Sequence, residues 1–236
     1  MTTTTSSNTS VSHPLPASHP PRFGRAGGIA ALVAALTYVV GFVILAAHLG
    51  PDGYLDSRED PTEALTFLLE HQSVYYVWNS VAYLLGGVAL VVLTLALHER
   101  LVRRSPAMSQ TATAFGLIWS GLILAAGMVI LVGQQAAVDL QATDADGAAS
   151  LWASVRAIQN GMGGGIELVG GVWALLLGLI GLRTGAFGRR LSVLGIVVGA
   201  AGILTVVPLL EPATAVFGLG FIAWFVATGR VLLAQR

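Results

Sequence analysis

One carboxylate of the chain, Glu167, lies inside a long apolar segment. An ionised group within a membrane helix costs about 2.5–3.5 kcal/mol on insertion scales, so this side chain is expected to face protein or water rather than lipid. On a continuous helix Glu167 shares one face with Arg156, Asn160 and Gly163. That face predicts either close packing, with Glu167 and Asn160 hydrogen-bonded to neighbouring helices, or the wall of a cavity that opens to the outside.

Further polar side chains lie at the ends of other apolar segments, near the level of Asn160. Our leading hypothesis is a non-enzymatic membrane protein that binds or passes a small ligand through an outward-facing pocket. Glu167 would hold a cation or a proton there, and Arg156 would attract an anionic group at the mouth. The residues assigned to this pocket are Glu167, Asn160, Arg156, His48, His71, Asn79 and Gln134.

Two other classes of function stay open. The chain could be a membrane-embedded enzyme, in which Glu167 with His48 and His71 acts as acid and base or as metal ligands on a lipid-like substrate. It could also be a structural or regulatory subunit, whose polar groups only hold helices together. A second copy of the chain or another membrane protein is then a possible partner.

The sequence gives no reason to expect a metal or a cofactor. Cysteine is absent, so thiolate sites and disulfides are excluded. Histidine and carboxylate could ligate zinc or iron, but no HExxH or similarly spaced ligand motif is present. We therefore predict neither a metal site nor a cofactor.

A glycine-rich stretch at 161–165 precedes Glu167. It is no phosphate-binding loop, because no strand precedes it and the chain contains no lysine. It predicts a bend or close helix packing. The alternative is a helix broken at a binding site, as transporters have. The pairs Gly116/Ser120 and Gly195/Gly199 have the spacing of helix-packing motifs.

The elements that must position these residues are membrane helices. Only 10% of the residues are charged and 55% are hydrophobic, with a mean hydropathy of +0.76. These values exclude an ordinary soluble domain, which has about 25% charged residues. The lipid bilayer is the expected partner, and the formal net charge of zero gives no attraction to nucleic acid.

We predict an all-α bundle of six transmembrane helices. A span needs about 20 mostly apolar residues. The chain would then consist of a disordered cytosolic tail at 1–24 and a transmembrane domain at 25–236. A short helix at about 61–70, begun by Asp60, Pro61 and Glu63, would lie on the outer leaflet. The six segments are 27–49, 76–97, 113–133, 161–182, 191–210 and 213–229.

Charge predicts the orientation of the bundle. With the N-terminus inside, ten of the 12 arginines fall on the inner side, and only Arg58 and Arg156 fall outside. Most acids fall on the outer side, whereas Glu99 is inside. This asymmetry follows the positive-inside rule and predicts that both termini are cytosolic.

The run GGIELVGGVWALLLGLIGLRTGAFGRRLSVLGIVVGAAGIL at 164–204 resembles the bacterial domain of unknown function 4386 family. Members have a glycine-rich span, a turn like the RTGAFGR at 183–189, and a Leu-Gly span. The RAG at 25–27 also fits, whereas Gln159-Asn160 stands where the family usually has His, Lys or Asn. The resemblance covers about 25–230 and implies an integral protein of the bacterial plasma membrane with about six helices. It implies no activity and no catalytic residue.

Overall fold

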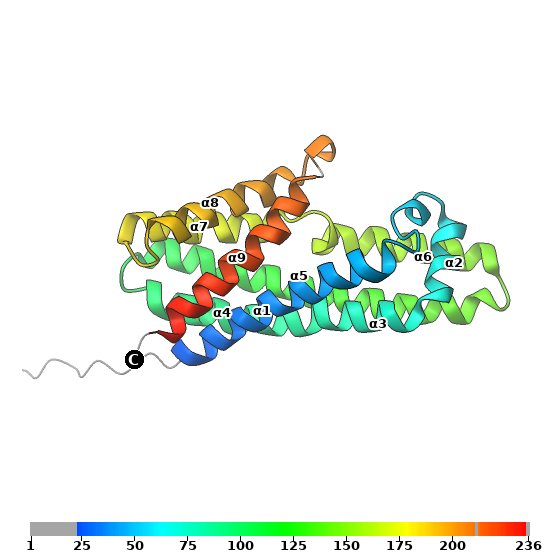
Figure 1. Ribbon diagram of the computed structural model, residues 1–236, viewed down its shortest axis with the longest axis horizontal. Coiled ribbons are helices and arrows are strands. Elements are labelled where there is room, and N and C mark those ends of the chain that lie inside the picture. The colour runs from blue at the N-terminus through cyan, green and yellow to red at the C-terminus, as the bar shows by residue number, and fades with distance from the viewer. Residues whose placement is uncertain (1–22, 211, 235–236) are drawn as a thin grey trace, which may run out of the picture.

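The computed structural model describes residues 23–210 and 212–234. The tail expected at 1–24 lies outside the described residues up to residue 22. The described part is helical, and its longest helices run along one common direction (Figure 1). The α-helices are α1 (Gly24–Ile44), α2 (Pro61–Glu70), α3 (Gln72–Asn79), α4 (Gly86–Leu101), α5 (Pro106–Gln141), α6 (Ala145–Gln159), α7 (Leu168–Thr184), α8 (Arg189–Leu204) and α9 (Ala213–Leu233).

Short π-helical and 3₁₀ segments join several of these helices. The π-helical segments are η1 (Leu45–Leu49) after α1, η3 (Ser80–Leu85) between α3 and α4, and η4 (Asn160–Gly164) after α6. The 3₁₀ segments are η2 (Asp56–Arg58) and η5 (Pro208–Leu210). As a result, α1 and η1 form one continuous helix. A second continuous helix consists of α3, η3 and α4.

Five helical stretches of the described residues are long and apolar enough to cross a membrane, so the chain is a multi-pass membrane protein. They are Gly24–Leu49, Gln72–Leu101, Pro106–Gln141, Ala145–Thr184 and Ala213–Leu233. The segment expected as a further span at 191–210 forms the 16-residue helix α8 instead. At 1.5 Å per residue α8 is about 24 Å long, shorter than a hydrocarbon core of about 30 Å.

Two helices extend far beyond the spans expected from the sequence. α5 has 36 residues and a length of about 54 Å, whereas apolar residues alone indicated 113–133. α6 lies between the third and fourth predicted spans, where no helix was expected. The end of α5, α6 and α2 pack together at one end of the molecule around a second hydrophobic cluster that includes Leu68 and Trp152. We call this part the head.

The helix expected at about 61–70 is α2, and it begins as its sequence indicates. The Asp60 side chain accepts hydrogen bonds from the backbone N–H groups of Thr62 and Glu63, at 2.7 and 3.0 Å. Pro61 occupies the first turn, where no N–H is needed. α2 buries Ala64, Leu65, Phe67 and Leu68 within the head.

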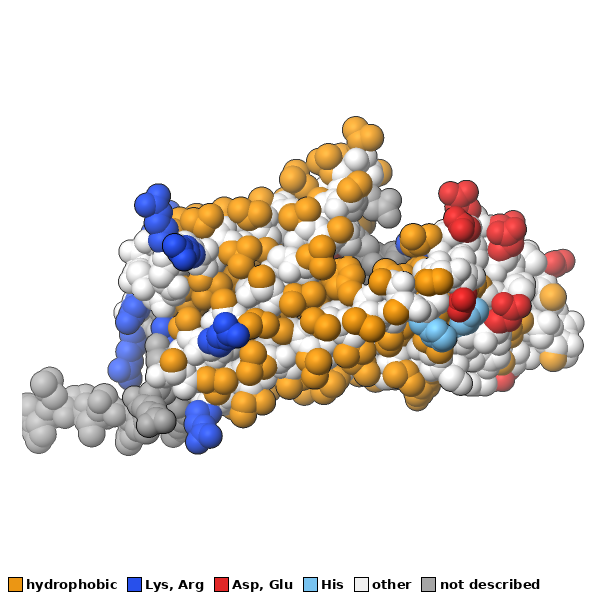
Figure 2. Space-filling view, in the orientation of Figure 1, with side chains coloured by type: hydrophobic (Ala, Val, Ile, Leu, Met, Phe, Trp, Pro, Cys, Tyr) orange, Lys and Arg blue, Asp and Glu red, His pale blue; other side chains and the backbone are white. Residues whose placement is uncertain are grey.

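Charges separate along the long axis of the molecule. In Figure 2 most of the visible arginines lie toward the end where α1 begins and α9 ends, and the visible acids gather on the head. The belt between them is mainly apolar on the visible face. Exposed Leu36, Val88 and Val132 are among the large apolar side chains of this belt. An exposed apolar belt is expected where a protein meets lipid.

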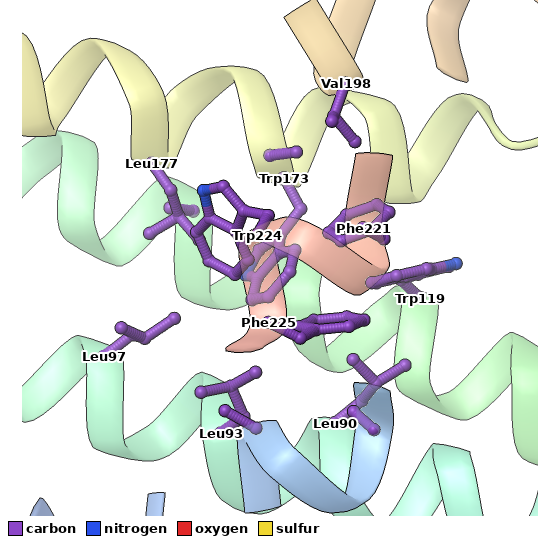
Figure 3. Packing of buried hydrophobic residues seen from close by; sticks show 14 of the residues in the cluster. Leu90, Leu93, Leu97, Trp119, Trp173, Leu177, Val198, Phe221, Trp224 and Phe225 are labelled. Atoms are coloured by element: carbon purple, nitrogen blue, oxygen red, sulfur yellow. The ribbon is translucent and has the colours of Figure 1, made fainter. Parts of the chain in front are cut away.

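Aromatic rings fill the centre of the bundle (Figure 3). Trp119 of α5 stacks on Phe221 of α9 with 5.3 Å between ring centroids, and Trp173 of α7 meets Trp224 of α9 edge-on at 5.5 Å. Trp119, Trp173, Trp224 and Trp152 of the head are each only 1% exposed, so these four indoles are core residues rather than anchors at a membrane surface.

Glycines set the closest helix contacts. A Cβ atom at Gly171 of α7 would lie 2.7 Å from the backbone nitrogen of Ile203 and 2.8 Å from the Gly199 carbonyl oxygen. A Cβ at Gly199 would lie 2.5 Å from the backbone nitrogen of Leu175. The Gly195/Gly199 pair therefore does serve helix packing, and α7 and α8 form a hairpin with touching backbones.

Candidate functional site

The site begins where the helix containing Asn160 breaks. After α6 the chain makes the π-helical turn η4, and Gly163 takes a φ of +118°, which only glycine adopts readily. α7 starts at Leu168, with Glu167 as its N-cap residue. The glycine-rich stretch is therefore a helix break rather than a bend in a continuous helix. The N-terminus of α7 lies inside the molecule.

Two side chains from other elements hold this break in place. The amide Nε2 of Gln159 donates to the hydroxyl of Tyr83 on η3, and Gly164 leaves the room that the Gln159 side chain needs. Thr205, just after α8, accepts a hydrogen bond from the backbone N–H of Glu167 at 2.8 Å. The Thr205 hydroxyl itself donates to the Gly202 carbonyl at 2.7 Å. The first free N–H of α7 is thus satisfied by a neighbouring helix.

Glu167 lies on the wall of a cavity of about 200 Å³, which we call the inner cavity. Its side chain is 8% exposed, and its Oε2 atom has no hydrogen-bond partner among the described residues. The indole N–H of the buried Trp119 interacts with the Glu167 carboxyl group, although the contact falls short of a full hydrogen bond. Most of the other lining is aromatic or small. The aromatic residues are Tyr38, Phe42, Trp78, Tyr83 and Phe217.

A second cavity of about 260 Å³, the outer cavity, adjoins the first on the side of the head. The two cavities share six lining residues, among them Ala82, Tyr83 and Gly164. Compared with the inner cavity, the outer cavity has more polar side chains in its lining. Arg58, Asn79, Arg156, Gln159 and Asn160 line it.

Two guanidinium groups lie on the outer cavity. Arg156 donates to the backbone carbonyl of Arg58 at 3.3 Å. The Arg58 guanidinium lies over the ring of Tyr54, 5.7 Å from its centroid. Asn79 is 6% exposed, and its side-chain Nδ2 donates to the Tyr75 carbonyl at 2.8 Å. The side-chain oxygen of Asn79 takes no part in this hydrogen bond.

Three of the residues predicted for the pocket line neither cavity: His48, His71 and Gln134. The rings of His48 and His71 meet edge-on at 6.2 Å, and His71 stacks on Phe67 and contacts Asp52 at 3.1 Å. Gln134 of α5 donates to the Gln72 carbonyl at 2.9 Å and so ties α5 to the start of α3. Gln134 and His71 therefore contribute to the packing of the head, whereas His48 is exposed on its surface.

The structure brings together the other four predicted residues, though not as the sequence suggested. Arg156, Asn160 and Glu167 do not lie on one continuous helical face, because the helix breaks between Asn160 and Glu167. They line two adjoining cavities, and Asn79 lines the outer one. Sequence analysis missed several residues that complete the lining: Tyr38, Arg58, Trp78, Tyr83 and Gln159. Arg58 carried a signal, since it is an arginine on the side expected to lack them.

Within the described residues, no group of three or more His, Asp or Glu side chains is placed to hold a metal ion. Neither histidine of the head lines the inner cavity with Glu167. The chemistry that this arrangement offers is therefore one buried carboxyl group among aromatic rings, with amides and guanidinium groups on the side of the head.

A multi-pass helical membrane protein with a broken helix and an internal polar cavity is the class that these observations define. The sequence profile of the family described as domain of unknown function (DUF4386) matches residues 26–233. The chain belongs to this family, as the resemblance at 164–204 predicted. No curated protein and no solved structure matches the chain.

The turn that carries much of the resemblance joins α7 to α8. Gly185 and Gly188 both have positive φ, of 70° and 71°, so that the chain reverses within a few residues. Arg100 of α4 donates to the Ala186 carbonyl at 2.8 Å and lies 5.7 Å from the ring centroid of Phe187. This family turn is thus a docking point between two helical hairpins, far from the two cavities in sequence.

Proposed function

We propose that the chain binds or passes a small ligand through a pocket made by the outer and inner cavities, which opens to the outside of a bacterial plasma membrane. The observation that carries this proposal is the Glu167 carboxyl group, which is buried on the wall of the inner cavity and whose Oε2 makes no full hydrogen bond to any described residue, its contact with the Trp119 indole being weak. Burying a polar group without a hydrogen bond is costly. A ligand in the cavity would supply the missing partner.

The size and lining of the two cavities support this proposal. Sites for small molecules are mostly apolar clefts of about 300–1,000 Å³ with a few placed polar groups. The inner cavity is the apolar part with one carboxyl group, and the outer cavity adds the guanidinium groups of Arg58 and Arg156. Arg156 would attract an anionic group of the ligand at the mouth.

The distribution of charge supports the orientation. The arginine-rich end would lie in the cytosol with both termini, and the acidic head would lie outside (Figure 2). α8 would then be a sixth, short span, since it pairs with α7 along its length. Shorter apolar helices are accommodated by local thinning of the bilayer.

Helix packing alone accounts less well for Glu167. A polar group that holds helices together is expected to hydrogen-bond across an interface. The contact of Glu167 with Thr205, the residue just after α8, uses the backbone N–H of Glu167, and the side-chain Oε2 makes no full hydrogen bond to any described residue. The enzyme hypothesis needs Glu167 beside His48 or His71, and neither histidine lines the inner cavity.

Single cysteines test this proposal, because the chain has none of its own. Asn160→Cys would report on the outer cavity and Glu167→Cys on the inner one, with lipid-facing Val88→Cys as the control. Whole cells are treated with a membrane-impermeant maleimide, which needs a hydrated thiolate. Labelling of the two cavity positions but not of Val88→Cys is expected. Absence of labelling at both cavity positions, in folded protein, would overturn the proposal.

A further inference from the structure

The lining of the inner cavity restricts the chemistry of its occupant. Five aromatic side chains and one carboxyl group line it, and none of its described lining residues is basic. The rings come from several elements: Tyr38 and Phe42 from α1, Trp78 from α3, Tyr83 from η3 and Phe217 from α9. A buried acid enclosed by aromatic rings from separate helices is a recognisable ligand cage.

Aromatic faces attract cations when the charge lies within about 6 Å of the ring centroid. The interaction strengthens where water is excluded, and aromatic cages are the usual means of recognising quaternary ammonium groups. Glu167 would add an opposite charge, and its Oε2 makes no full hydrogen bond to any described residue, although the Trp119 indole lies close to the carboxyl group. An ammonium group would thus satisfy both the rings and the carboxylate.

A hard metal ion fits this lining poorly. Calcium takes six to eight oxygen ligands, and magnesium requires octahedral oxygen geometry. The inner cavity presents one carboxyl group with the hydroxyls of Thr37, Tyr38, Tyr83 and Thr214, spread over a volume of about 200 Å³. A larger, weakly hydrated cation suits such a volume better than a bare ion does.

We infer that the inner cavity is a binding site for an organic ammonium group, held between the Glu167 carboxylate and the faces of Tyr38, Trp78 and Tyr83. This inference rests on the proposed function, because the ligand must enter through the outer cavity. The rest of the ligand extends past Ala82 and Gly164, which border both cavities. There it meets Arg156 and Asn160, so an acceptor group at that end of the ligand completes the match.

The test uses choline and its uncharged isostere 3,3-dimethylbutan-1-ol, which has the same shape without the positive charge. Binding of each compound to the purified full chain in detergent is measured by calorimetry. Choline is expected to bind at least about tenfold more tightly than the isostere, because only the cation gains from the rings and the carboxylate. Glu167→Gln is expected to abolish most of this preference by weakening the binding of choline.

A second variant keeps the test decisive if Glu167→Gln fails to fold. Trp78→Leu removes one ring and keeps the carboxyl group, and it is expected to reduce the preference for choline several-fold. Equal binding of the two compounds, or no binding of choline at millimolar concentration, would overturn the inference. If the cysteines at 160 and 167 are nevertheless labelled from outside, the ammonium site is wrong and the outward pocket stands. If they are silent, the proposed function itself fails.

Discussion

The hydroxyl of Thr205 accepts a hydrogen bond from the backbone N–H of Glu167, with 2.8 Å between the two atoms. This contact joins the end of α8 to the start of α7, 38 residues earlier in the chain. It supplies a partner to an N–H group that the helix itself leaves free, and the Glu167 side chain is then available to the inner cavity.

Replacing Thr205 by valine is expected to destabilise the protein, because the buried N–H of Glu167 would lose its acceptor. An unsatisfied buried donor costs about 1–3 kcal/mol. The free energy of unfolding of the purified protein in detergent measures the effect. Thr205→Ser retains the hydroxyl and serves as the control. Equal losses in both variants would mean that the threonine methyl group, not the hydrogen bond, matters.

Gly163→Ala tests the helix break. The φ of +118° at this residue is unfavourable for any L side chain, so we expect a loss of about 1–3 kcal/mol in the free energy of unfolding. Gly121→Ala on α5 is the matched control, since its Cβ would meet nothing within 4 Å and alanine favours a helix there. If Gly163→Ala is as stable as Gly121→Ala, the chain does not break at this residue.

The contact between α7 and α8 is predicted to tolerate no side chain at Gly171. Its Cβ would collide with backbone atoms of Gly199 and Ile203, which cannot rotate away. Overpacking of this kind costs about 1–3 kcal/mol or more. Thermal unfolding of Gly171→Ala is compared with Gly161→Ala, where space is open. Similar midpoints for the two variants would contradict the observed packing.

Orientation can be measured with two exposed positions at opposite ends of the molecule. Asp56→Cys on the head is expected to react with an impermeant maleimide in intact cells. Arg104→Cys, between α4 and α5, is expected to react only after the cells are permeabilised. The reverse pattern would place the acidic head in the cytosol and remove the support for an outward pocket.

The sequence predicted the elements that depend on local signals. The apolar runs indicated the membrane helices, and Asp60 with Pro61 indicated the start of α2, because capping is a local interaction. The length of α5 and the helix α6 were missed. They lie where polar residues interrupt the apolar pattern, and their helices are stabilised by packing in the head around residues such as Trp152.

The site was predicted only in part for a similar reason. An acid such as Glu167 inside an apolar segment can be recognised as a candidate from sequence, because placing an ionised group in lipid costs free energy. His48 and His71 were placed at the right end of the molecule, but sequence does not tell which way a side chain at a helix end points: His71 packs against Phe67 of the head, and His48 is exposed beside it. Tyr83 and Trp78 gave no signal, because aromatic residues in a membrane helix are ordinary.

In the proposed function Glu167 is reached from outside through the outer cavity, so a bulky side chain between the two cavities should block access to it. Ala82 borders both cavities, so Ala82→Trp is expected to fill the passage between them. We would measure the rate at which an impermeant maleimide labels Glu167→Cys in whole cells, with and without this plug, and use Ala82→Ser as the control. The tryptophan is expected to slow the labelling of Glu167→Cys by about tenfold or more, because the reaction requires water at the thiol. Asn160→Cys, which lies in the outer cavity, is expected to react as before. An unchanged rate at residue 167 would contradict the passage through the outer cavity, and no labelling even in the unplugged protein would contradict the pocket itself.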